Sequence, residues 1–172
     1  LQAIGQHLGY HLQVVGPVQA GSEVISSSQI RNLLLSGDVE AAAGLLGRPY
    51  SVQGNIISGQ QRGRRIGIPT ANLDLPASRL LPANGVYATR ALINGQPWAS
   101  VTNIGLRPTF ENAPVLPRVE AHIMDFTGDL YNHEIKLEFI AHLRSEQTFP
   151  NVQDLIEQIQ KDIRQAREVL HA

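Results

Sequence analysis

The chain has 172 residues, of which 42% are hydrophobic and 17% charged, and a formal net charge of −1. This length can bury one full core and part of another, and the near-zero charge argues against broad binding to nucleic acid or to an anionic membrane. The absence of cysteine excludes disulfides and thiolate catalysis, and the six histidines show no metal-ligand spacing. No apolar run is long enough to cross a bilayer. We expect a globular protein of the cytoplasm.

The N-terminal block, residues 1–47, has a helical pattern. A serine run offers N-caps for a helix over 29–35, and Asp38 is placed to cap a second helix over 39–46. Residues 12–15 form a candidate strand that leads into a Gly-Pro turn. The block contains apolar residues but no segment of its own to bury them against, so we interpret it as the tail of a domain.

From residue 48 onward the pattern changes to β. Val52, Gly54 and Ile56 alternate with polar residues and predict a strand. Further along, Asn94-Gly95 separates two apolar runs. Asparagine and glycine both tolerate positive φ, so this dipeptide predicts a β-hairpin with a type I′ turn.

Two further strands are predicted over 119–126 and 134–142. In the second of these, alternate residues are apolar and the residues between them are charged. Many short strands separated by turn signals favour a small antiparallel barrel. The chain closes with a helix capped by Asn151, whose apolar residues recur at three- and four-residue spacing and predict a helix that plugs or flanks the barrel.

The most informative stretch runs from Gly59 to Asn72. Its glycines would let backbone N–H groups approach a phosphate, and its three arginines add positive charge. Thr70 and Asn72 share one face of an extended segment, and both are oxygen donors suited to Mg²⁺. From the residues alone two alternatives stay open: a basic surface hairpin, and a turn begun by Pro69 whose polar side chains bond their own backbone.

Glu120 is a second candidate, in a predicted strand where it alternates with apolar neighbours. A carboxylate in the mouth of a barrel could accept a proton from an attacking hydroxyl. A charged side chain on the solvated face of a strand is the commoner case. His122, two residues further along, suggests no role by itself.

Two more segments combine arginine with an aromatic residue, at 103–110 and at 143–149. A guanidinium and an aromatic ring could flank a planar ligand. As an alternative, both are ordinary loops, and Arg144 forms a surface pair with Glu146.

In order and spacing, four motifs together resemble the riboflavin kinase family. They are Gly-Arg-Arg-Ile-Gly-Ile-Pro-Thr-Ala-Asn, Asn-Ile-Gly-x-Arg-Pro-Thr-Phe, Val-Glu-x-His-Ile-x-Asp-Phe and Leu-Arg-x-Glu-x-x-Phe. The resemblance covers residues 48 to 170. It implies a six-stranded antiparallel, Greek-key-like barrel with a C-terminal helix, and an ATP- and Mg²⁺-dependent kinase that phosphorylates the ribityl 5′-hydroxyl of riboflavin to give FMN and ADP.

The resemblance also implies roles for individual residues. Thr70 and Asn72 would ligate Mg²⁺, and Glu120 would be the general base for the ribityl hydroxyl. The residues implied to bind the two substrates are Gly59, Gly63, Arg64, Thr70 and Tyr131 for ATP, and Arg144 and Phe149 for the flavin.

The N-terminal block resembles the end of the adenylyltransferase domain in bacterial bifunctional riboflavin kinase/FAD synthetases. The matching stretch runs from Val24 to Arg31, with Ser28 where the motif has threonine. We therefore expect residues 1–47 to be a remnant of that domain and residues 48–172 to be the kinase domain. The rest of the adenylyltransferase domain, and with it the formation of FAD from FMN, would belong to a full-length parent.

Two rival functions remain open. One is a barrel that holds flavin or nucleotide without turnover, which would need no base at Glu120. The other is FAD synthesis by the intact parent, with this chain as its flavin-binding half.

Overall fold

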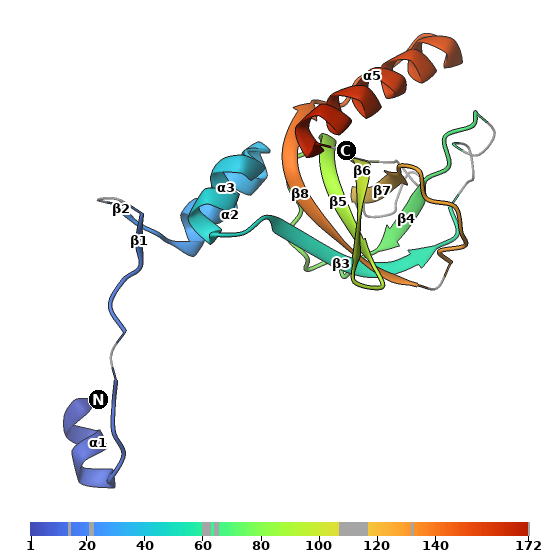
Figure 1. The fold of residues 1–172 in the computed structure, drawn as a ribbon. Helices are drawn as coiled ribbons and strands as arrows, with labels where there is room; N and C mark the ends of the chain where they lie inside the picture. Colours follow the sequence, from blue (N-terminus) through green and yellow to red (C-terminus); the bar gives the residue numbers. More distant parts are fainter. Residues whose placement is uncertain are drawn as a thin grey trace, which may run out of the picture.

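The computed structural model describes residues 1–13, 15–20, 23–59, 63, 66–106, 117–131 and 133–171. Six strands close into an antiparallel barrel in the order β3-β4-β7-β6-β5-β8 (Figure 1). Their bounds are β3 (Tyr50–Ile57), β4 (Ala71–Asp74), β5 (Gly85–Ile93), β6 (Gln96–Leu106), β7 (Pro117–Ile123) and β8 (Glu134–Arg144). The predicted barrel is confirmed, with the last two strands shifted from their predicted ends by up to three residues.

The β5–β6 hairpin turns at the predicted dipeptide. Asn94 has φ of 50° and Gly95 φ of 79°, and the residues on either side, Ile93 and Gln96, are register partners. Two central residues with positive φ are what a type I′ turn requires, so this prediction is confirmed.

The main core fills the barrel with alternate residues of each strand. On β3 the buried positions are Val52, Gly54 and Ile56, as the alternation predicts. On β8 they are Ile135, Leu137, Phe139 and Ala141. Ala141 belongs to a second cluster, which lies outside the barrel under the C-terminal helix.

That helix, α5 (Val152–Leu170), flanks the barrel and does not plug it (Figure 1). Ala166 is fully buried against Val86, Ala88 and Val101 of β5 and β6. At the helix start the Asn151 side chain accepts a hydrogen bond from the N–H of Asp154, which confirms the predicted N-cap.

The N-terminal block contains α1 (Gln2–Leu8), the two-residue strands β1 (Gln19–Ala20) and β2 (Glu23–Val24), α2 (Ser27–Ser36) and α3 (Val39–Leu46). The sequence did not predict α1. Residues 12, 13 and 15 lie in no strand, since the local pairing forms between 19–20 and 23–24 instead. The two predicted helices are confirmed, and Asp38 caps the second through the N–H of Ala41.

Helices α2 and α3 pack against the barrel, whereas α1 lies apart from it (Figure 1). Leu34, Val39 and Ala42 are fully buried and belong to the same core as the barrel interior. The N–H of Ala83, before β5, also donates to the carbonyl of Leu34. These two helices therefore bury their apolar residues against the barrel, which the sequence did not anticipate. In the part of the chain that the structure describes, none of the helices is long and apolar enough to cross a membrane.

Candidate active site

A row of three polar side chains crosses the outer surface of the barrel. Asn72 on β4 is the register partner of Glu120 on β7, and Glu120 is in turn the partner of Asn103 on β6. The neighbours of Glu120, Val119 and Ala121, are buried in the barrel core. Side chains alternate between the two faces of a strand, so all three members of the row project outward. The sequence left open a carboxylate in the barrel mouth and one on the solvated face of the strand, and the structure places Glu120 on the outer face.

Two glycines of the loop before β4 lie against the predicted magnesium ligands. A Cβ atom added to Gly59 would collide with the side-chain amide of Asn72. A Cβ atom added to Gly63 would lie 3.4 Å from the Thr70 hydroxyl oxygen and would collide with the carbonyl of Ile68. The missing side chain at Gly59 therefore leaves the space in which the Asn72 amide sits, and the missing side chain at Gly63 lets the turn close against the Ile68 carbonyl.

A short turn holds Gly63 in this place. Its carbonyl accepts the N–H groups of Ile66 and Ile68 at 3.1 and 2.8 Å. No hydrogen bond joins the Thr70 or Asn72 side chain to a described backbone group, and such bonds are what the alternative of a self-bonded turn requires. Arg64 lies outside the described residues.

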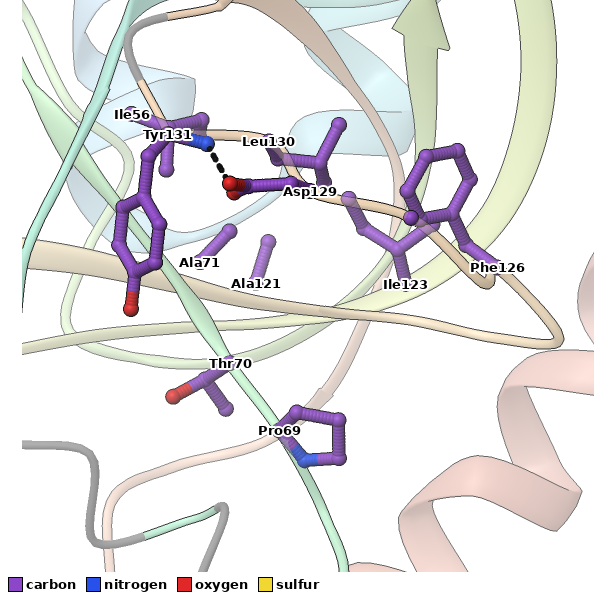
Figure 2. Close-up of a pocket in the computed structure, with 11 residues that line it drawn as sticks. Ile56, Pro69, Thr70, Ala71, Ala121, Ile123, Phe126, Asp129, Leu130 and Tyr131 are labelled. Atoms are coloured by element: carbon purple, nitrogen blue, oxygen red, sulfur yellow. Dashed lines mark hydrogen bonds between the residues drawn. The ribbon is translucent and has the colours of Figure 1, made fainter.

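A cavity of about 550 Å³ opens beside Thr70 (Figure 2). One wall comes from the loop after β7, which contributes Asp129 and Tyr131, and the floor is apolar. In Figure 2 the ring of Tyr131 extends from that loop toward Thr70. The N–H of Tyr131 donates to the Asp129 carboxylate at 2.9 Å, which fixes the turn. Thr70 and Tyr131, both predicted to bind ATP, thus line one cavity.

His122 ties the glycine-rich segment to β7. Its Nδ1 lies 2.8 Å from the carbonyl oxygen of Pro69, so the ring donates from that nitrogen. The contact fixes the residue directly before Thr70 against the strand that carries Glu120. No local sequence pattern indicates this contact, because the two residues are 53 positions apart.

Arg144, at the end of β8, is held by a buried carboxylate on α5. Its Nε and Nη2 donate to Asp162 at 2.9 and 2.8 Å, and its Nη1 donates to the carbonyl of Ser145. The guanidinium carbon lies 5.9 Å from the centroid of the Phe149 ring. The predicted flavin-binding residues are therefore neighbours. The alternative of a surface pair between Arg144 and Glu146 is wrong, because the guanidinium pairs with Asp162, which is 2% exposed.

The oxygens of Thr70 and Asn72 suit a magnesium ion that also binds a nucleotide. Mg²⁺ usually takes few protein ligands and keeps waters and substrate phosphates for its other positions. Thr70 lines the cavity and the Asn72 side chain projects outward from the barrel, so this donor set fits such an ion. Among the described residues, no group of three or more histidine, aspartate and glutamate side chains could hold a metal.

Comparison with known protein families decides the membership of the chain. The family model described as riboflavin kinase matches residues 46–170. The chain belongs to the riboflavin kinase family. This match covers all six barrel strands and α5, and all four motifs recognised in the sequence.

Bacterial relatives are longer than this chain. The bifunctional riboflavin kinase/FMN adenylyltransferase of Bacillus subtilis is 47% identical over 83% of this chain and 45% of its own length. The enzyme of the same name from Pseudomonas fluorescens is 38% identical over 97% of this chain and 53% of its own length. The chain thus spans about half the length of the curated relatives it matches.

Solved structures agree on the fold. The crystal structure of a macrolide-efflux protein from Streptococcus pneumoniae has a TM-score of 0.84 and 32% identity, and the match covers 96% of this chain and 54% of that one. The riboflavin kinase of Trypanosoma brucei has a TM-score of 0.52 at 24% identity, covering 72% of this chain and 80% of that one, which supports the barrel fold alone.

Proposed function

We propose that this chain transfers the γ-phosphoryl group of ATP to the ribityl 5′-hydroxyl of riboflavin, giving FMN and ADP. The observation that carries the proposal is the outward-facing row of Asn72, Glu120 and Asn103, which lies next to the two glycines and the cavity at Thr70. Membership in the riboflavin kinase family supports it.

In the proposed reaction the 5′-hydroxyl oxygen attacks the γ-phosphorus, the bond to the β-phosphate oxygen breaks, and ADP leaves. The Glu120 carboxylate accepts the proton of the hydroxyl. The Thr70 and Asn72 oxygens would hold Mg²⁺, whose charge when bound offsets that of the phosphates. Gly59 leaves space for the Asn72 amide, Gly63 closes the turn before Thr70, and Tyr131 borders the nucleotide. Arg144 and Phe149 line the flavin site.

We also propose that residues 1–47 belong to an adenylyltransferase domain and residues 48–172 to the kinase domain. The family match beginning at residue 46 supports this boundary. Leu1, Leu8 and Val15, in the first part of the block, are exposed, whereas α2 and α3 pack into the barrel core through Leu34, Val39 and Ala42. Formation of FAD is accordingly proposed for a longer parent.

The test is incubation with riboflavin, ATP and Mg²⁺, with FMN and FAD measured separately. We expect FMN but no FAD, also when FMN is supplied as the substrate. FAD formed at a rate comparable to FMN would refute the assignment of residues 1–47, and absence of FMN would leave a binding barrel without turnover.

Variants separate the roles of the base and the metal ligand. Glu120→Gln keeps size and hydrogen bonding but cannot take the proton, so kcat should fall by about 10²–10⁴-fold with KM values little changed. Glu134→Gln, on the exposed start of β8, is the matched control and should leave kcat unchanged. A fall of less than about threefold for Glu120→Gln would exclude it as the base. Asn72→Ala should remove most activity while the barrel stays folded.

A further inference from the structure

The carboxylate of Glu146 occupies a space that the absence of a side chain at Gly105 creates. Glu146 follows β8, and Gly105 lies near the end of β6. A Cβ atom added to Gly105 would collide with the Glu146 Oε1 atom and lie 3.0 Å from its Cδ. The carboxylate therefore packs directly on the β6 backbone, although it belongs to a loop more than forty residues later in the chain.

Asn103 lies beside the same point. Its side-chain nitrogen is 3.1 Å from the Cβ position built on Gly105, and it is the register partner of Glu120. Two residues of a strand span about 6.8 Å, so Gly105 lies about that far along β6 from the row containing the proposed base. Glu120, Asn103 and Glu146 thus form a polar track along the outer surface of the barrel.

The position of this carboxylate is not explained by an ion pair. Arg144, the nearest cation in the sequence, gives its guanidinium to Asp162. Within the described ranges, no hydrogen bond or ion pair satisfies the Glu146 carboxylate or the Asn103 amide. Their hydrogen-bonding groups are therefore available to a ligand.

Room for a ligand lies at the same place. A hollow of about 540 Å³ is lined by Glu146, Gln147 and Thr148. The start of this loop is fixed, because Arg144 is bound both to Asp162 and to the carbonyl of Ser145. The carboxylate is therefore presented by an anchored segment, between the Glu120 row on one side and the proposed flavin-binding residues on the other.

We infer that Asn103 and Glu146 bind the hydroxyl groups of the substrate's ribityl chain, and that Glu146 makes the site select flavins with a polyol chain. The inference rests on the proposed function, which places the terminal hydroxyl of the ribityl group at Glu120. Hydroxyls both donate and accept hydrogen bonds, a carboxylate accepts several, and an amide does both. A polyol running along the track would satisfy both side chains.

The test measures equilibrium binding without ATP, using riboflavin and lumiflavin. The second flavin has the same ring system but a methyl group in place of the ribityl chain. Wild type should bind riboflavin more tightly. Glu146→Ala should weaken riboflavin binding by about tenfold or more, because a hydrogen bond to a charged group is lost, and should leave lumiflavin binding unchanged. Gly105→Ala displaces the carboxylate and should act in the same direction.

Glu134→Ala removes a carboxylate from the exposed start of β8, at the opposite end of the strand from the hollow, and is the control that should not change the ratio of the two affinities. Equal weakening of both flavins by Glu146→Ala, or no weakening of either, would overturn the inference. So would a wild-type protein that does not distinguish the two flavins or binds neither. If FMN is formed but Glu146→Ala leaves the ratio of riboflavin to lumiflavin affinity unchanged, the inference fails while the proposed function stands. If Glu146→Ala abolishes the preference for riboflavin over lumiflavin but the wild-type protein forms no FMN, only the proposed function fails.

Discussion

Two ion pairs with the same nitrogen–oxygen distance fasten α5 to the barrel, and they differ in burial. Arg144 reaches Asp162 at 2.8 Å, with side chains 16% and 3% exposed. Arg167 reaches Asp125 at 2.8 Å, with side chains 39% and 69% exposed. Both arginines make two or more hydrogen bonds to their carboxylate. Replacing each aspartate by asparagine removes the charge at constant size, so the two variants compare a buried pair, whose carboxylate also accepts from Gln158, with an exposed one.

For Asp162→Asn we expect the free energy of unfolding to fall by about 3 kcal/mol. Breaking a fully buried pair costs roughly 3–5 kcal/mol because a charge is left unpaired. The lower end of this range applies because the Arg144 side chain is partly exposed and still donates a hydrogen bond to the carbonyl of Ser145. For Asp125→Asn the expected loss is below about 1 kcal/mol, and asparagine tolerates the φ of 58° at this position. Urea unfolding of both variants measures the two losses. Equal losses, or less than about 1 kcal/mol for Asp162→Asn, would refute the reasoning.

Three further predictions test other parts of the molecule. Gly59→Ala should displace the Asn72 amide and lower kcat/KM by roughly 10²-fold. Gly44→Ala, whose new Cβ would meet nothing within 4 Å outside its own helix, should leave kinase activity unchanged. Equal activities of the two variants would contradict a role for Gly59 in positioning Asn72. Leu34→Ala should lower the unfolding free energy by about 2–5 kcal/mol, and a negligible loss would show that α2 is not part of the core. Burial raises the pKa of Tyr87 to about 12, so the neutral phenol contributes stability that is fully present below pH 10 and is lost toward pH 12. The difference in unfolding free energy between wild type and Tyr87→Phe should therefore be smaller at pH 11 than at pH 8. The same difference at both pH values would contradict this reasoning.

The sequence predicts most of the fold because local signals are strong where the barrel needs them. Asn94-Gly95 supplies the two positive φ angles of the hairpin by residue type alone. The alternation on β3 and β8 follows from burial of one face. Asp38 and Asn151 cap their helices through bonds to residues three positions away, which is within the reach of local sequence patterns.

Contacts that join distant segments could not be predicted in the same way. Asp162 is a charged residue on a helix, and its burial depends on Arg144 arriving from β8. Helix α2 buries Leu34 against the barrel, which the sequence of residues 1–47 cannot indicate because the complementary surface is formed by later strands. The outward direction of Glu120 follows from which face of β7 meets the core, and alternation by itself leaves both faces possible.

Two glycines of the proposed substrate surface share one physical role. Gly59 faces the Asn72 amide and Gly105 faces the Glu146 carboxylate. Neither has the positive φ that favours glycine, so the space left by the missing side chain explains the residue. Gly54 and Gly63 differ, because an added Cβ would collide with a backbone carbonyl: that of Asp74 on the paired strand for Gly54, and that of Ile68 in the turn before Thr70 for Gly63. Activity and stability should therefore separate among these glycines: alanine at 59 or 105 moves a polar side chain on the outer surface, whereas alanine at 54 pushes two strands apart and alanine at 63 disturbs the turn itself.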